Sequence, residues 1–431
     1  MFQTISNFMR VGDIRRKILF TLLMLVIFRL GTFIPVPNVN ADVLGAQDKL
    51  SVFGILNTFG GGALKKFSIF AMGIMPYITA SIIIQLLQMD VVPKFTEWSK
   101  QGEAGRRKVA QFTRYFTVIL GFIQAFGMAY GFNNLAGGQL IQNPGIGKYL
   151  LIALVLTAGT SFLMWLGEQI TEKGVGNGIS IIIFAGIVAQ IPTTVNQIYV
   201  QLFSNAGEQL FIRIVTAVLI AIAVIAVVVG VIFIQQANRK IPIQYAKSVA
   251  AGRNPVGGQS THMPLKVNAA GVIPVIFAVS FIVTPRTVAS FFPTNSVTTW
   301  IINVFDYSHP IGMILYAALI IAFTYFYAFI QVNPEQAAEN LQKQSGYIPG
   351  IRPGKSTQEY LTRVLYRLTL IGAIFLAVIA VLPVLFIQIA NLPQTAQIGG
   401  TSLLIVVGVA LDTMKQLEAQ LVKRHYKGFI K

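Results

Sequence analysis

Residues that could carry out chemistry are few in this chain, and their spacing argues against a catalytic or metal site. The sequence Gly-Ile-Arg-Pro-Gly-Lys-Ser at 350–356 comes closest to a phosphate-binding loop. It is one residue short of that motif, its proline removes a backbone N–H, and no strand is predicted before it. His262, His309 and His425 lie far apart in predicted loops, so they do not suggest a shared metal or acid–base site. We therefore predict that the protein is not an enzyme and needs no cofactor or metal.

Composition places most of the chain inside a membrane. Hydrophobic residues make up 54% and charged residues only 11% of its 431 residues, whereas a soluble domain carries about a quarter charged residues. A helix needs about 20 mostly apolar residues to cross a bilayer, and ten segments meet that condition. We therefore expect an all-α polytopic membrane protein whose first span is retained, because no signal-peptide cleavage site follows it. The predicted spans are 18–36, 68–89, 110–132, 148–167, 178–198, 211–235, 270–291, 310–331, 367–390 and 398–414.

The distribution of positive charge predicts the orientation of these spans. If both termini are cytoplasmic, 26 of the 33 Lys and Arg fall in cytoplasmic segments, as the positive-inside rule requires. Ten spans divide into two halves, 1–205 and 206–431. Because each half has an odd number of spans, the second half enters the membrane from the opposite side. We therefore predict an inverted repeat of two five-helix halves, with the long basic loops 236–269 and 332–367 facing the cytosol.

Two repeated motifs support this division. Residues 73–78 and 271–276 both read Gly-[Ile/Val]-x-Pro-x-Ile, and they lie in the second and seventh spans, which the inverted repeat pairs. The fifth and tenth spans, also paired, begin with similar sequences in which Ser180 matches Ser402. Spans interrupted by Gly and Pro at matching places in two halves mark broken helices that meet near the middle of the bilayer. We therefore expect a pathway between the halves, bounded by these four spans.

Isoleucines on the four interrupted spans are candidates for the narrowest part of that pathway. On the second and fifth spans they occur in pairs four residues apart, which places both members on one helix face. For any single isoleucine, packing is the simpler interpretation, but the matching positions in both halves favour a ring. An apolar ring excludes ions by dewetting, and flexible aliphatic side chains can part around a wide substrate such as an extended polypeptide. The candidate ring is Ile74, Ile78, Ile179, Ile183, Ile276 and Ile405.

A secondary transporter of a small solute is the alternative, because inverted repeats with broken helices are typical of that class. Such a transporter normally needs ionisable groups within the membrane. The acids Asp90, Glu168, Glu172 and Asp412 all fall at predicted cytoplasmic ends, and Arg29 is the one charge that we place within a span. The sequence therefore favours a conduit over a transporter coupled to an ion gradient.

Six motifs along the chain resemble the bacterial SecY family, whose members are channel subunits of the general protein translocase. The resemblance runs from Arg10 to the C-terminal tail. It implies a protein-conducting channel that passes unfolded secretory polypeptides across the membrane. It also implies that transmembrane segments leave sideways into lipid. The motifs are 73–78, 165–171, 176–181, 259–268, 347–354 and 399–406.

The resemblance also assigns parts of the chain. The two halves would form a clamshell hinged between the fifth and sixth spans, and the isoleucine ring would be its constriction. The second and seventh spans, with the third and eighth, would form a lateral gate. The apolar part of the external loop 37–67 is too short to span the membrane, and we interpret it as a surface helix or a re-entrant segment. A re-entrant segment is tolerated only where it is buried in protein or lines a cavity. The resemblance implies that residues near 52–66 form a re-entrant plug helix. The plug residues would be Leu56, Asn57, Thr58, Phe59, Gly60, Gly61 and Gly62.

Partners are implied by the resemblance as well. The ribosome or the SecA ATPase motor would bind the basic loops, although positive-inside topology alone would also place charge there. SecE would clamp both halves, SecG would lie at the side, and the substrate would carry a signal sequence. The location would be the bacterial plasma (inner) membrane, multi-pass, with lipid around it and both termini cytoplasmic. The docking residues would be Arg239, Lys240, Lys247, Arg253, Arg352 and Lys355.

Overall fold

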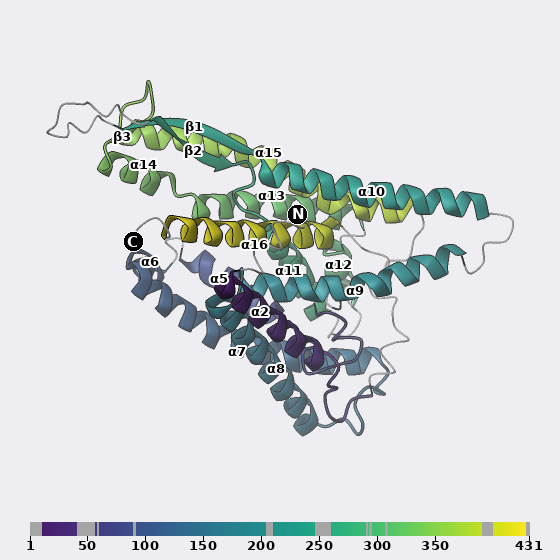
Figure 1. Ribbon diagram of the computed structural model, residues 1–431. Helices are drawn as coiled ribbons and strands as arrows, with labels where there is room; N and C mark the ends of the chain where they lie inside the picture. The colour runs from purple at the N-terminus through teal and green to yellow at the C-terminus, as the bar shows by residue number, and fades with distance from the viewer. Residues whose placement is uncertain are drawn as a thin grey trace, which may run out of the picture.

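Ten long helices dominate the computed structural model, which describes residues 11–40, 57, 60–88, 92–203, 210–245, 260–289, 292, 295–306, 309–389 and 400–427. Each helix coincides with one predicted span, in order, which confirms the ten-helix prediction. Figure 1 shows them as two groups that diverge like the halves of a clamshell. They are α2 (Gly12–Gly31), α5 (Met75–Leu87), α7 (Gly102–Leu135), α8 (Ile146–Lys173), α9 (Gly178–Phe203), α10 (Leu210–Gln236), α11 (Ile273–Ala289), α13 (Pro310–Gln331), α15 (Lys355–Ile389) and α16 (Gly400–Lys427).

The outer surface of this bundle is apolar, as a lipid-facing surface must be. Helix α10 buries only Val231, while Phe211, Ile222 and Phe233 on the same helix are more than half exposed. Among the described helices, α7, α8, α9, α10, α13 and α15 are long and apolar enough to cross a membrane by length and composition alone. Helices α5 and α11 are apolar but shorter, at 13 and 17 residues.

The two shorter helices begin later than predicted, and glycine conformation explains the delay. The predicted spans start at 68 and 270, whereas the helices start at Met75 and Ile273. Residues 60–74 form turns instead of helix. Gly73 and Gly271 have φ of 57° and 66°, a left-handed conformation that cannot continue a right-handed helix and that suits glycine.

A three-stranded sheet joins the two long basic loops, and the sequence predicted no strand there. Strands β1 (Asn238–Tyr245), β2 (Ser260–Lys266) and β3 (Gly346–Tyr347) pair antiparallel in the order β2-β1-β3. Helix α14 (Pro334–Lys343) packs beside them. In Figure 1 the sheet, α14, the short helix α6 (Pro93–Lys100) and the C-terminus lie at one end of the molecule. We call this the sheet end.

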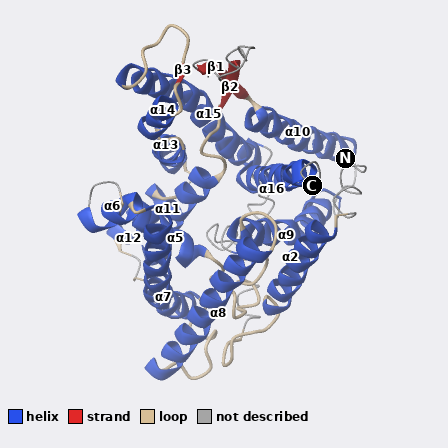
Figure 2. Cartoon of the chain, turned by 60° about the vertical axis from the view of Figure 1, so that its left-hand side comes forward, coloured by secondary structure: helices blue, strands red, loops and turns tan. Residues whose placement is uncertain are grey.

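Helices α5, α9, α11 and α16 surround the middle of the molecule in Figure 2. Their buried side chains join those of α2, α8, α13 and α15 in the largest hydrophobic cluster, the central cluster, which therefore draws on both halves. A second cluster, built from residues between Val36 and Leu156, lies entirely within the first half. The predicted hinge lies between the fifth and sixth spans, and residues 204–209 of that connection are outside the described residues.

Candidate channel site

The repeated motif has the same backbone structure in both halves. In each copy the glycine has positive φ, the helix begins two residues later, and proline occupies its first turn, where the missing N–H costs no hydrogen bond. The last residue of each copy closes the first helical turn: Ile78 N–H donates to Ile74 O (3.1 Å), and Ile276 N–H donates to Val272 O (3.4 Å). Ile78 and Ile276 are therefore equivalent positions of two broken helices.

All six predicted ring isoleucines join the central cluster. Five are buried, with exposed fractions between 0% and 5%, and Ile179 packs against the cluster while partly exposed. The cluster also contains other apolar residues of the same helices, such as Val275 and Ile182, so burial alone does not distinguish the ring. Equivalent positions in the two halves set two pairs apart from the rest of the cluster. Ile78 pairs with Ile276 through the repeated motif. Ile183 pairs with Ile405, because each lies five residues after the glycine that begins its helix.

Helices α5 and α11 pack against each other and form the seam between the halves on one side. Helix α7 flanks α5, and α13 flanks α11. The ring of Phe277 on α11 meets those of Phe323 and Tyr327 on α13 edge-on, at centroid distances of 5.9 and 6.1 Å. The α11–α13 contact is thus reinforced by aromatic pairs, which are worth about 0.5–1.5 kcal/mol each beyond their burial. These are the four helices that the sequence predicts for a lateral gate.

The glycine run of the predicted plug lies between α2 and α9. Arg29 Nη1 on α2 donates to Gly61 O at 2.6 Å. Gly61 has φ of 67°, and a Cβ there would come within 3.2 Å of the Gly186 backbone on α9, so the site requires glycine. A Cβ on Gly62 would collide with the side chain of Gln190.

Asn57 anchors the same segment. Its side chain is buried, its Oδ1 accepts from Lys65 N–H (3.1 Å), and its backbone oxygen accepts from Gly62 N–H (2.9 Å). Gly60 is buried as well. The other predicted plug residues, Leu56, Thr58 and Phe59, lie outside the described residues.

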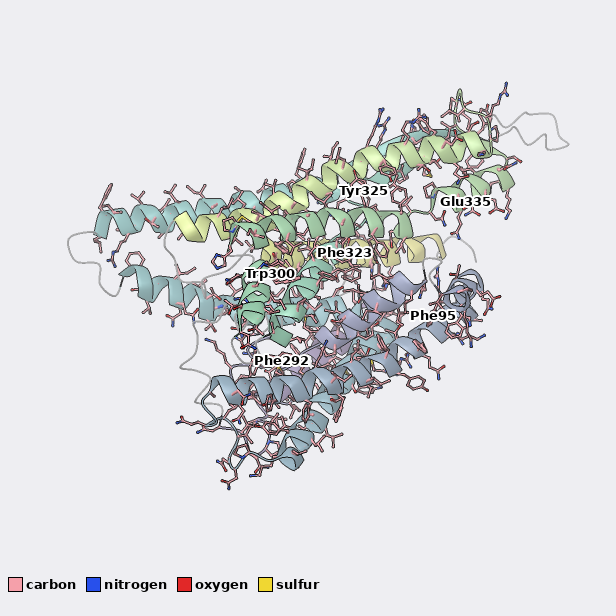
Figure 3. All side chains as sticks on the ribbon, turned by 180° about the vertical axis from the view of Figure 1, so that it is seen from behind. Phe95, Phe292, Trp300, Phe323, Tyr325 and Glu335 are labelled. Carbon is pink, nitrogen blue, oxygen red and sulfur yellow. The ribbon has the colours of Figure 1, made fainter. Side chains whose placement is uncertain are left out.

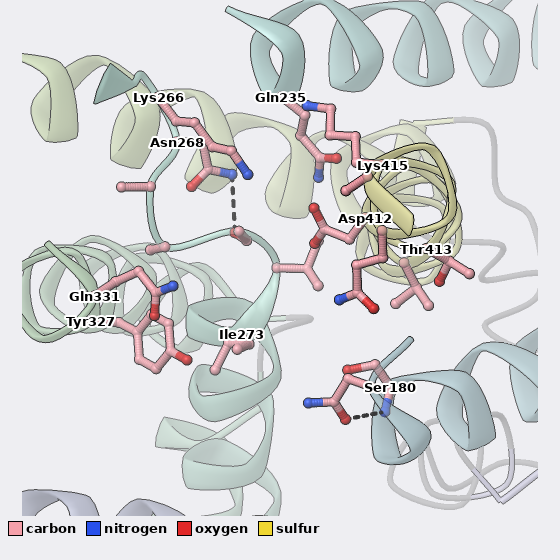
Figure 4. Close-up of a pocket in the computed structure, with 18 residues that line it drawn as sticks. Ser180, Gln235, Lys266, Asn268, Ile273, Tyr327, Gln331, Asp412, Thr413 and Lys415 are labelled. Atoms are coloured by element: carbon pink, nitrogen blue, oxygen red, sulfur yellow. Dashed lines mark hydrogen bonds between the residues drawn. The ribbon is translucent and has the colours of Figure 1, made fainter. Parts of the chain in front are cut away.

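A cavity of about 450 Å³ opens at the sheet end of the central cluster. Its lining comes from the starts of α9 and α11, the ends of α10, β2 and α13, and the polar half of α16. Figure 4 shows polar and charged side chains around it, among them Lys266, Asp412 and Lys415, with Ile273 and Ser180 at its edge. Asn268 Nδ2 donates to Gly271 O at 3.0 Å, which ties the end of β2 to the turn before α11. The cavity therefore borders the central cluster, whose Val272 and Val409 line it.

The described members of the predicted docking set belong to one folded unit at the sheet end. Ile241 on β1 shares a buried cluster with Ile348 and with Leu361 of α15, so the loops 236–269 and 332–367 pack together. Arg239 and Lys240 on β1 are exposed, as are the remaining two predicted docking residues, Arg352 and Lys355. Lys247 and Arg253 lie outside the described residues.

The loop at 350–356 corrects one sequence inference. Strand β3 precedes it and α15 follows from Lys355, so the prediction that no strand comes before it is wrong. Thr357 Oγ1 donates to Arg352 O at 2.9 Å and holds this turn. The short spacing and Pro353 still separate it from a phosphate-binding loop. No group of His, Asp and Glu within the described part of the chain is arranged to hold a metal ion.

A buried ion pair corrects a second inference, that Arg29 is the one charge within a span. Arg286 lies in the last turn of α11, and its Nη2 is 2.9 Å from Asp306 Oδ2. The two side chains are only 9% and 13% exposed. Removing one partner of such a pair costs about 3–5 kcal/mol. The sequence analysis counts Arg286 among the external charges. Its position within the apolar segment 270–291, which contains no acid, is the signal that could have indicated a partner elsewhere in the chain.

Comparison with known proteins decides the family. A sequence model of the SecY family matches residues 68–414. The chain belongs to the SecY family. Proteins named protein translocase subunit SecY from Bacillus licheniformis and Bacillus subtilis are 76% and 73% identical to it, each over the full length of both chains. As a SecY-family translocase subunit the chain is a multi-pass membrane protein and not an enzyme, and the small-solute transporter alternative falls away.

Solved structures agree on the SecY fold. One described as a protein-conducting channel aligns with a TM-score of 0.62 at 18% identity, over 97% of this chain and 95% of that one. Sec61 in a canine ribosome–channel complex aligns with a TM-score of 0.58 at 17% identity, over 97% and 95%. At these identities the likeness concerns the fold, and it includes the clamshell of ten helices.

Proposed function

We propose that the chain forms a channel that conducts unfolded secretory polypeptides between its two halves and releases transmembrane segments into lipid between α5 and α11. One observation carries the proposal. Four helices, two from each half, bring isoleucines at equivalent positions into one buried cluster that borders a cavity lined by polar side chains. In this arrangement the polar cavity is the hydrated entrance, and the buried isoleucines are a constriction that excludes water. Because aliphatic side chains offer no hydrogen bonds, the constriction selects neither ions nor particular side chains.

The glycine run serves as the base of the plug in this proposal. Its backbone approaches α9 closely at Gly61, and Arg29 holds the same residue through its carbonyl. Because Arg29 bonds to the backbone oxygen of Gly61, this contact fixes the position of the segment whatever its side chains are.

We assign the supply of energy to a cytosolic partner that docks at the sheet end. The unit formed by β1–β3, α14 and the start of α15 presents Arg239, Lys240, Arg352 and Lys355 to it. We assign this surface to the SecA ATPase and to the ribosome, and place SecE against both halves with SecG at the side. The ribosome assignment has support in the fold, since a structural neighbour was solved in a ribosome–channel complex. We assign both termini to the cytoplasm and the chain to the plasma (inner) membrane of a bacterium, an assignment that the distribution of Lys and Arg supports.

Site-specific photocrosslinking tests the pathway. A photoreactive amino acid at Ile276 should crosslink to a secretory polypeptide arrested halfway through the reconstituted complex. Ile152 is the matched control, because it is also a buried isoleucine but belongs to the cluster within the first half. Crosslinks at Ile276 and none at Ile152 support the pathway. Equal crosslinking at both positions, or none at Ile276, would place the polypeptide elsewhere.

A further inference from the structure

Helix α12 (Ser296–Val304) presents an apolar surface that nothing in the described chain covers. It carries no charged residue and buries none of its residues. Val297 and Trp300 are 67% and 63% exposed, and Phe292 just before the helix is 61% exposed. Figure 3 shows Phe292 and Trp300 on the same face of the molecule. A helix of this composition gains little from facing water on every side.

The neighbours of α12 show what surrounds it. It packs against α11 and α13, two apolar helices of the bundle. Phe281 and Val288 on α11 are about half exposed, and Ile311 and Ile314 at the start of α13 are more so. Phe281 and Val288 are seven residues apart and share a helix face. The exposed residues of α12 are therefore continuous with the lipid-facing surface of the bundle.

The position of α12 along the membrane normal follows from the chain path. Helix α11 begins just after β2, so its last turn and α12 lie at the end of α11 away from the sheet end. The buried Arg286–Asp306 ion pair joins that last turn to the residue two positions after α12. At its other end α12 has a capping box between Asn295 and Thr298. Both ends of α12 are thus fixed, and one of them is fixed to α11.

We infer that α12 is seated in the headgroup–acyl boundary of the membrane leaflet away from the sheet end, with Val297 and Trp300 in contact with lipid. Tryptophan favours that boundary because its ring is apolar and its indole N–H finds polar partners there. An uncharged apolar face on a short helix packed side-on against spanning helices suits the lipid boundary. The ion pair makes α12 follow α11. If α11 is the gate helix, which rests on the proposed function, opening the gate moves a lipid-embedded element.

Trp300 itself reports on this inference. The chain has three tryptophans, so Trp98→Phe with Trp165→Phe leaves Trp300 as its single tryptophan, which is excited selectively above the absorption of tyrosine. The complex is reconstituted in phosphatidylcholine–phosphatidylglycerol vesicles whose acyl chains carry bromine either near the glycerol or near the methyl end. We expect a loss of Trp300 emission, larger with bromine near the glycerol, and little quenching by aqueous iodide. Strong iodide quenching without bromolipid quenching overturns the inference, and protection from both quenchers overturns it in favour of a protein partner.

The ion pair has a separate test in the same background. Asp306→Asn should reduce bromolipid quenching of Trp300, and the exchange Arg286→Asp with Asp306→Arg should restore it. Retention of Trp165 in place of Trp300 provides the control, since its quenching should not respond to either change. Unaltered Trp300 quenching in a complex that still assembles would show that the ion pair does not hold α12. The position of α12 at the lipid boundary does not depend on the polypeptide pathway. A negative quenching result would therefore not contradict the proposed channel, and a negative crosslinking result would not contradict the position of α12.

Discussion

Arg29 and Gly61 are joined by a hydrogen bond between the guanidinium Nη1 and the backbone oxygen, 2.6 Å apart. The guanidinium also lies 4.9 Å from the centre of the Phe33 ring, whose other cationic neighbour is Lys66 at 3.5 Å. A charge near the end of an apolar helix is costly unless it is paired. Here its partner is the backbone of the predicted plug, so the charge is stabilised when that segment is in place.

Replacing Arg29 with leucine should therefore favour displacement of the plug. A hydrogen bond from a charged donor contributes about 1.5–3 kcal/mol, which shifts the equilibrium by about 10- to 150-fold. We expect more frequent ion-conducting openings of the resting complex in planar bilayers. Arg29→Lys keeps the charge and should show a smaller effect. Openings as rare as in the unmodified complex would remove Arg29 from plug positioning.

The left-handed glycine at the start of α11 gives a stability prediction. A Cβ on Gly271 meets no neighbouring atom, so only its φ of 66° opposes substitution. That conformation costs an L-residue about 1–2 kcal/mol, and asparagine tolerates it best. We expect Gly271→Val to lower the melting temperature of the purified complex more than Gly271→Asn does.

Gly230 on α10 is the matched control for that measurement, because it lies within a helix and its Cβ would make only ordinary contact with Phe375. Gly230→Ala should leave the melting temperature unchanged or raise it slightly. If Gly271→Val were as well tolerated as Gly230→Ala, the left-handed turn would not be needed to start α11.

Much of this fold is predictable from sequence because membrane constraints act locally. Span length predicts the ten helices, and the repeated motif predicts the pairing of α5 with α11. The start of α5 is not predictable in this way, because residues 68–74 are apolar enough for a span and only the φ of Gly73 shows the turn.

Contacts between distant segments were missed for a different reason. The sheet pairs Asn238 with Lys266 and Gln244 with Tyr347, and Pro242 and Pro264 within the strands hide the strand pattern from local reading. The Arg286–Asp306 ion pair likewise cannot be predicted from the sequence, because it depends on how α12 packs against α11. The ring isoleucines could be nominated only because two halves of one chain repeat the same motif.

Arg352 gives a prediction about the cytosolic partner. It is exposed in the turn between β3 and α15, so charge reversal should leave the fold intact. We expect Arg352→Glu to abolish motor-driven secretion while largely sparing insertion of membrane proteins, measured with inverted membrane vesicles. Arg363→Glu, also exposed on α15, is the control and should keep both activities. Equal loss of secretion and insertion in Arg352→Glu would indicate misfolding instead.

The seal itself is most directly measured as ion conductance of the resting complex in planar bilayers. Replacing Ile78, Ile183, Ile276 and Ile405 together with glycine should open a steady ion leak, because the apolar ring that excludes water is gone. Four exposed isoleucines of α10, namely Ile212, Ile214, Ile222 and Ile225, changed in the same way should give no leak. A steady leak from the first set alone is the expected result. Conductance unchanged from the unmodified complex would contradict the assignment of these isoleucines as the seal.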